Sequence, residues 1–202
     1  MKRPTLCFLM LTFLALTACS LGGQSKPARF YELSPIAGAA SVGTVGNGNL
    51  SVGIGPLQLP DILDRPQIVT REDAYRLALA EFDRWGGDLE RNLLRVLSQN
   101  MMQRLGTNKV VTYPWQRRDT PDFQVSIRFF RFDGALGEEA TLTGAWRIIS
   151  DQQECPLTVQ RFAISKAPSD DGYAALVDAL SRGVADLSQS IADKLAASGR
   201  GC

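Results

Sequence analysis

The chain has 202 residues, of which 45% are hydrophobic and 21% charged, and this size and composition predict one globular domain with a sizeable core. Its formal net charge of +1 gives no long-range attraction to nucleic acid or anionic lipid, so we expect no nucleic-acid partner. Histidine is absent, which excludes Ser-His-Asp and Cys-His catalysis and histidine-ligated zinc.

The N-terminal segment divides into three zones. Lys2 and Arg3 give a positive start, an almost wholly apolar run extends from Leu6 to Thr17, and Leu16-Thr17-Ala18-Cys19 closes the segment. This order is typical of a secretory signal, and about a dozen apolar residues fall short of the roughly 20 that a membrane-spanning helix needs. The last four residues match the lipobox of bacterial lipoproteins. We therefore predict a signal peptide at residues 1–18 and covalent diacylglycerol and N-acyl lipid on Cys19; an ordinary signal peptide is the alternative.

The body of the protein is expected to begin close to the lipid. Residues 19–28 form a lipidated tether, and the eight residues from Leu21 to Ala28 reach at most about 28 Å. Ser20 stands where lipoproteins retained in the inner membrane typically carry Asp, so we expect the mature protein on the periplasmic face of the outer membrane. Residues 29–202 then form a single domain. Removal of Lys2 and Arg3 with the signal peptide changes the net charge of the mature chain from +1 to about −1.

The first half of this domain reads as short strands followed by a helix. Strands are predicted over 30–33, 50–55, 68–70 and 75–79, with a flexible Gly/Ala/Ser/Val loop at 36–49. Asp88 is a suitable N-cap for a helix over 89–105, whose apolar residues recur on one face, and Gly106 suits its C-terminal end.

The second half combines a hairpin with a longer helix. A strand is predicted at 109–113, and apolar residues alternate over 123–129 and 142–148 around a turn at 134–137. A further strand at 158–166 precedes a helix over 172–198 with one apolar face. The expected fold class is α+β, with a largely antiparallel sheet and two long amphipathic helices on one face.

Two cysteines besides Cys19 remain in the mature chain, Cys155 and Cys202. In the oxidising periplasm such a pair favours a disulfide over a metal site. The strand after Cys155 spans about 30 Å and the last helix about 40 Å, so antiparallel packing of the two would return Cys202 to the level of Cys155. We predict a Cys155–Cys202 disulfide that stabilises the fold by roughly 4 kcal/mol, with two free thiols as the alternative.

Motifs that carry chemistry are missing. No G-x-S-x-G, Walker A or C-x-x-C pattern occurs, and Gly46-Asn47-Gly48 lacks the third glycine of a dinucleotide-binding loop. The adjacent acids Glu138-Glu139 and Asp170-Asp171 fall in predicted turns, where solvated carboxylates are expected. The segment 128–132 mixes arginine with phenylalanine as single-strand nucleic-acid surfaces do, but here it favours a strand with one core face and one wet face. We expect a non-enzymatic protein with no cofactor or metal.

Several segments of the mature chain resemble the PqiC/YmbA-type family of ABC-transport auxiliary lipoproteins. The resemblance covers nearly the whole mature chain, and its most specific part is the segment Leu-Asp-Arg-Pro-Gln-Ile-Val at 63–69. Its main departure is the longer loop at 36–49. The matching residues are the lipobox, 30–33, 54–60, 63–71, 82–85, Leu89, Asn92, Leu93, Val96, Leu97, 131–134 and Trp146.

The resemblance implies a non-enzymatic role in intermembrane lipid transport that supports envelope integrity. Such lipoproteins are outer-membrane partners of MCE-domain proteins, which form lipid-conducting tubes, and of inner-membrane transport subunits. Family members are similar to subunits that form homo-oligomeric rings. Two other functions remain open: a stand-alone periplasmic lipid- or ligand-binding module, with an acyl chain held between sheet and helices, and an accessory lipoprotein for outer-membrane protein assembly.

The segment from Pro60 to Arg71 is our candidate for a subunit or partner contact. Two prolines stiffen it, and polar side chains stand among apolar ones, with Arg65 and Gln67 expected to be exposed. The alternative is a rigid connector that caps the sheet. The candidate contact residues are Pro60, Asp64, Arg65, Pro66 and Gln67.

Thiol counting tests the disulfide. The mature protein, denatured without reductant, should contain no free thiol at Cys155 or Cys202, because the periplasm oxidises the pair. Two free thiols in the unreduced protein would refute the bond, and the same count after reduction serves as the control.

Overall fold

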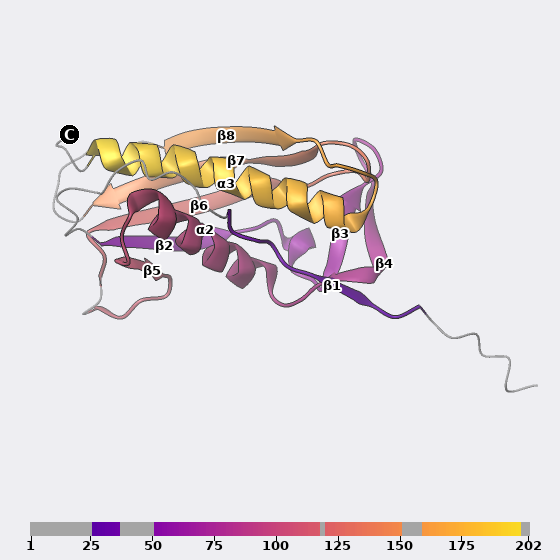
Figure 1. Cartoon of the computed structure of the whole chain (residues 1–202), viewed down its shortest axis with the longest axis horizontal. Helices are drawn as coiled ribbons and strands as arrows, with labels where there is room; N and C mark the ends of the chain where they lie inside the picture. The colour runs from indigo at the N-terminus through magenta and orange to yellow at the C-terminus, as the bar shows by residue number, and fades with distance from the viewer. Residues whose placement is uncertain (1–25, 37–50, 118–119, 151–158, 199–202) are drawn as a thin grey trace, which may run out of the picture.

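The computed structural model describes residues 26–36, 51–117, 120–150 and 159–198. Within these ranges two α-helices and eight strands follow one another along the chain (Figure 1). The elements are β1 (Arg29–Tyr31), β2 (Val52–Gln58), the 3-10 helix η2 (Asp61–Leu63), β3 (Gln67–Arg71), β4 (Leu77–Trp85), α2 (Leu89–Leu105), β5 (Val110–Thr112), β6 (Phe123–Asp133), β7 (Ala140–Ser150), β8 (Val159–Lys166) and α3 (Tyr173–Ser198).

The strands form two mixed sheets, which corrects the expected fold class. One sheet has three strands in the order β1-β4-β3, and the other has five in the order β5-β2-β6-β7-β8. β1 pairs with β4 in parallel, and β2 pairs in parallel with both β5 and β6. The predicted fold class, one largely antiparallel sheet with two long helices on one face, is therefore wrong, because the strands are divided between two sheets that contain both parallel and antiparallel pairs.

Parallel pairs were missed because side-chain periodicity marks a strand but not its neighbours. Antiparallel hairpins such as β6–β7 join consecutive strands through a short turn, whereas parallel strands need a crossover connection. Here the chain leaves β2, builds β3, β4 and α2, and only then returns to β2 as β5. Such long-range pairing leaves no local signal in the sequence.

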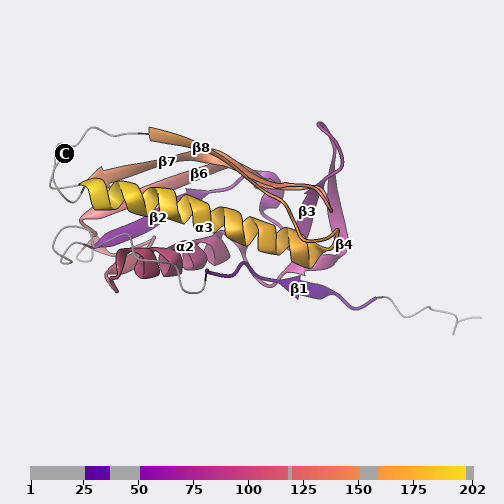
Figure 2. The ribbon, with the colours of Figure 1, turned by 45° about the horizontal axis from the view of Figure 1, so that its top comes forward.

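The two helices lie along the five-stranded sheet and share one buried core. α2 contacts β2 and β5, α3 contacts β7 and β8, and the helices contact each other (Figures 1 and 2). Asp88 caps α2 by accepting a hydrogen bond from Arg91 N at 2.8 Å, and Gly106 ends the helix with φ 58°. The predicted helix and both of its end signals are confirmed.

The hairpin of β6 and β7 is also confirmed, and it carries a bulge. Inward positions such as Val125 and Ile127 are buried, while the register shifts between Phe129 and Arg131. Phe130 lies at this shift and is 54% exposed. Phe130 therefore stands on the outward face of the sheet, while Phe129 before it points into the core.

An ion pair joins the two sheets. Arg71 of β3 donates to Asp133 of β6 at 2.9 Å, and its backbone N–H donates to the carbonyl of Gly134. Burial alone would raise the pKa of Asp133, but hydrogen bonds from Arg71 and Arg131 bring that pKa below its ordinary value. The three-stranded sheet is therefore fixed to the end of the β6–β7 hairpin.

A second buried carboxylate holds β1, the strand that follows the tether. Asp83 of β4 is 4% exposed and accepts hydrogen bonds from Arg29 at 2.8 Å and from the Tyr31 hydroxyl at 2.6 Å. Burial would raise the pKa of Asp83, yet the hydrogen bonds from Arg29 and Tyr31 lower it. After β1 the chain crosses α2, where the Asn92 side chain accepts a hydrogen bond from Leu33 N at 2.8 Å.

Replacing Asp83 by Asn should therefore weaken the fold in a pH-dependent way. A carboxylate with a lowered folded pKa stabilises the protein above about pH 4, and this contribution is lost as the pH falls through the folded pKa. At pH 7 Asp83→Asn should unfold at lower urea concentration than the unaltered protein, and the difference should narrow below about pH 4. Urea titrations at several pH values measure this, with the exposed Asp171→Asn as control. A difference that stays constant with pH would contradict the ionic role of Asp83.

Candidate binding site at the start of helix α2

A surface pocket of about 840 Å³ lies where β2 ends and α2 begins. We call it the acidic socket and define it by its lining. Its apolar residues are mostly buried, and four of its polar residues are acidic. The apolar lining is Leu57, Leu59, Pro60, Leu63, Pro66, Trp85 and Leu89, and the polar rim is Gln58, Asp61, Asp64, Arg65, Asp88 and Glu90.

Local hydrogen bonds fix the wall formed by the chain between β2 and β3. Leu63 N donates to the carbonyl of Pro60 at 2.9 Å, which closes the turn of η2. At the other end, Trp85 N donates to the carbonyl of Pro66 at 2.7 Å. Because proline fixes its own φ, both ends of this wall are conformationally restricted before anything binds.

Like charges crowd the rim. Burial, followed by the nearby carboxylates of Asp88 and Asp64, raises the pKa of Glu90. The rise occurs although Glu90 lies in the first turn of α2, where the helix dipole favours a carboxylate. A cation placed in the socket would relieve this repulsion.

Arg65 is the one cation of the socket, and it is poorly satisfied. The side chain is half-buried, and its Nε atom is buried without a hydrogen-bond partner in the described part of the chain. A buried donor left without a partner is destabilising. The socket thus combines neighbouring carboxylates with a buried donor that has no partner, and both features are unfavourable to the stability of the free protein.

The structure brings together four of the five residues proposed from the sequence. Pro60, Asp64, Arg65 and Pro66 line the socket, whereas Gln67 begins β3 and pairs with Arg84 of β4. The expectation that Arg65 and Gln67 are exposed is wrong, since both are half-buried. The backbone of Arg65 is fixed in the bend before β3, where its N–H donates to the carbonyl of Leu63 at 2.8 Å. Gln67 lies within the three-stranded sheet.

Sequence reasoning missed the opposite wall. Trp85, Asp88 and Glu90 come from the end of β4 and the start of α2, more than twenty residues further along the chain than Pro60. Asp88 was identified only as a helix cap. Nothing in the local pattern shows that this turn faces the bend at Pro60.

The other predicted sites fall elsewhere. Cys19, Cys155 and Cys202 lie outside the described residues, so the lipid site and the disulfide stay predictions. β8 and α3 do run in opposite directions side by side (Figure 1). No helix within the described ranges has the length and apolar character to cross a membrane, and in those ranges no three His, Cys, Asp or Glu side chains are placed to hold a metal ion together.

Comparison with known sequences gives one family match. The family of ABC-type transport auxiliary lipoprotein components matches residues 31–192. No curated protein sequence matches the chain.

Solved structures share this fold. The crystal structure of an uncharacterised protein is similar with a TM-score of 0.69 and 20% identity, over 84% of this chain and 99% of that one. Protein XCC0632 from Xanthomonas campestris is similar with a TM-score of 0.64 and 14% identity, over 85% and 97%. A PelC dodecamer from Paraburkholderia phytofirmans reaches a TM-score of 0.41 at 12% identity, over 79% and 94%, which is too distant to support an inference about assembly.

Replacing Glu90 by Gln should stabilise the free protein at neutral pH. A carboxylate whose folded pKa is raised destabilises the fold once it ionises, so stability is lost as the pH rises through that folded pKa. Glu90→Gln should melt at a slightly higher temperature than the unaltered protein at pH 7, and the gain should vanish below about pH 4. Thermal melts across this range test it, with the exposed Glu81→Gln as control. A loss of stability at pH 7 would show that Glu90 is needed for the fold.

Proposed function

The chain belongs to the family of ABC-type transport auxiliary lipoprotein components, and from this membership we propose that it is a non-enzymatic docking subunit in intermembrane lipid transport. In this proposal the protein is anchored in the outer membrane. It forms a homo-oligomeric ring that receives an MCE-domain tunnel protein, which in turn meets inner-membrane transport subunits. Its transport role supports envelope integrity.

The observation that carries the proposal is the extent of the family match. Residues 31–192 include the end of β1, both sheets, η2, α2 and most of α3. The acidic socket lies wholly within this range. The family likeness therefore extends over the candidate binding surface as well as the core.

The lipobox and the position of β1 support the anchoring. Cys19 precedes Lys26, the first described residue, by seven residues, which reach at most about 25 Å. β1 is held to β4 through Asp83, at the end of the molecule where the three-stranded sheet lies (Figure 2). The body would thus stay near the membrane with this end toward it.

The socket suits docking better than chemistry. Its rim offers one arginine and four exposed carboxylates, which water solvates, and its lining contains no serine, threonine, cysteine or lysine. An apolar lining surrounded by charged groups is typical of a surface that binds another protein.

The packing of the core weighs against the function of a separate lipid-binding module. That function would place an acyl chain between the sheet and the helices. In the described core this region is filled by fully buried side chains from both helices, among them Leu93 and Leu97 of α2 and Leu180 and Leu187 of α3.

Affinity purification of the lipidated protein tests the proposal. We would purify the protein from gently solubilised total membranes and identify its partners by mass spectrometry, and locate it separately by membrane fractionation. The expected result is recovery of an MCE-domain protein and an inner-membrane transport subunit, with the protein itself in the outer-membrane fraction. The matched control is the unlipidated Cys19→Ala variant, which should not fractionate with the outer membrane.

Other outcomes would redirect the assignment. Recovery of a β-barrel protein as the main partner would favour the role in outer-membrane protein assembly. Recovery of bound lipid without protein partners would favour the lipid-binding module, and recovery only with inner-membrane markers would overturn the proposed location.

A further inference from the structure

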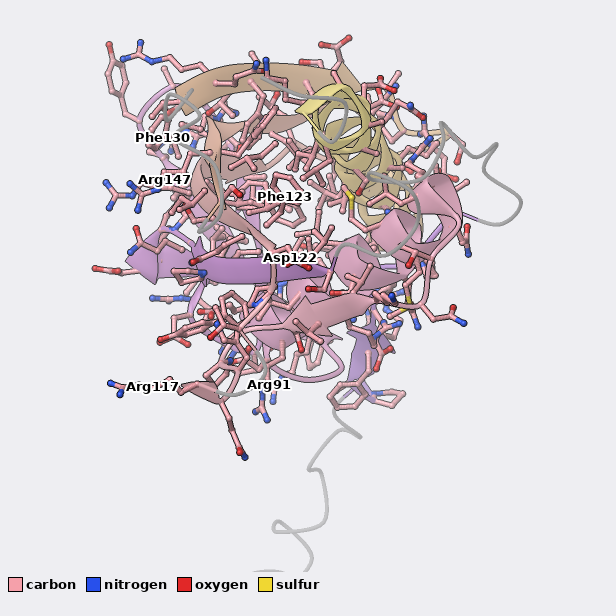
Figure 3. All side chains as sticks on the ribbon, turned by 90° about the vertical axis from the view of Figure 1, so that its left-hand side faces the viewer. Arg91, Arg117, Asp122, Phe123, Phe130 and Arg147 are labelled. Atoms are coloured by element: carbon pink, nitrogen blue, oxygen red, sulfur yellow. The ribbon has the colours of Figure 1, made fainter. Side chains whose placement is uncertain are left out.

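The five-stranded sheet presents a basic surface on the side away from the helices. We call it the basic face and define it by Arg128, Phe130, Arg147, Val159 and Arg161, all exposed. In Figure 3 Phe130 and Arg147 project from the strands away from the helices, whereas Phe123 points toward them. Residues 126–130, 143–147 and 159–163, which carry this face, contain no acidic residue.

The arginines of this face have no acidic partner in the described structure. Arg128 donates to the side-chain oxygen of Gln58 at 2.6 Å, and Arg147 donates to the hydroxyl of Ser126 at 3.0 Å. Both acceptors are neutral, so the positive charge of each guanidinium stays uncompensated. Many other surface arginines are paired, for example Arg76 with Asp73 and Arg182 with Asp178.

An aromatic side chain stands among these charges. Phe130 lies at the β6 register shift on the outward face, in alternation with the buried Phe129, and it is 54% exposed. A shallow hollow of about 370 Å³ is lined by Phe130, Arg128, Arg147 and Val159. The face therefore offers an apolar projection surrounded by cations.

The acidic socket is complementary to this face in charge, and it has room for an aromatic side chain. It has an apolar lining and a rim of four carboxylates against one arginine, and its volume of about 840 Å³ exceeds that of an aromatic side chain. We propose that the basic face of one copy docks into the acidic socket of the next copy, with Phe130 against the apolar lining and Arg128 and Arg147 near Asp64 and Glu90.

Such a contact joins two different surfaces of the same chain. Head-to-tail contacts of this kind form rings when the rotation between neighbours closes, whereas two-fold contacts form dimers. Gln58 lines both the socket and the hollow beside Phe130, so the two surfaces are adjacent on each copy. This inference rests on the proposed function, because it identifies the subunit contact of the proposed ring.

Paired charge reversals provide the test. In the full-length lipidated protein, Arg128→Glu with Arg147→Glu reverses the face, and Asp64→Arg with Glu90→Arg reverses the socket. Each double variant should raise the concentration of half-dissociation by about tenfold or more, because like charges then meet across the contact. The four changes combined in one chain should restore assembly, since every contact again joins opposite charges. Light scattering on size-exclusion fractions in detergent measures the assembly.

Control variants separate the contact from effects on folding. All four positions are exposed, so melting temperatures should change little beyond the slight rise expected when the Glu90 carboxylate is removed. Arg117→Glu and Asp193→Arg reverse exposed charges outside both surfaces and should leave assembly unchanged. Phe130→Ala should weaken assembly without reversing any charge. Assembly of the unaltered protein should also weaken as salt rises.

The outcomes distinguish this inference from the proposed function. If the unaltered protein assembles but the double variants assemble equally well, the contact is overturned while the ring stands. If the four combined changes fail to restore assembly, the two surfaces do not meet. If the face variant instead loses only its binding to vesicles containing phosphatidylglycerol, the basic face binds lipid and the contact is overturned. A monomeric unaltered protein overturns both the contact and the ring.

Discussion

The parallel pairing of β2 with β6 is the constraint on which the other surfaces depend. It places Gln58, at the end of β2, beside Arg128 of β6, so the chain leaves the sheet next to its outward face. From there the bend at Pro60 and the turn of η2 lead back past the start of α2 and form the socket. If β2 were antiparallel to β6, Gln58 would lie at the opposite end of β6, and the socket would be separated from the basic face.

The second sheet determines how the body meets the tether. β1 adds only three residues to β4, a length that backbone hydrogen bonds alone would hold weakly. Asp83 strengthens this attachment by accepting hydrogen bonds from Arg29 and Tyr31. The side chains of Asn92 and Asn100 in α2 accept hydrogen bonds from the backbone of the segment that follows β1. The strand closest to the lipid is thus tied to the core by side chains rather than by sheet length.

Much of the fold was predictable because its signals are local. Alternating apolar residues identified β6 and β7, and Asp88 and Gly106 identified the ends of α2. The division into two sheets and the three parallel pairings were not predictable, since they depend on contacts between distant segments. Half of the candidate site was found for the same reason: Pro60 and Pro66 mark a stiff bend, whereas Trp85 and Glu90 reach it only through the tertiary fold.

Net charge alone conceals how charge is distributed over this molecule. The mature chain is nearly neutral, and from that value we expected no long-range attraction to anionic surfaces. The structure separates carboxylates into the socket and unpaired arginines onto the sheet, two regions that adjoin at Gln58. At physiological salt, screening limits electrostatic interactions to about 8 Å. Each region therefore interacts with a surface in direct contact and only weakly with a distant membrane. A neutral chain that carries separate acidic and basic regions is better suited to bind another copy of itself than a chain whose surface has one sign of charge throughout.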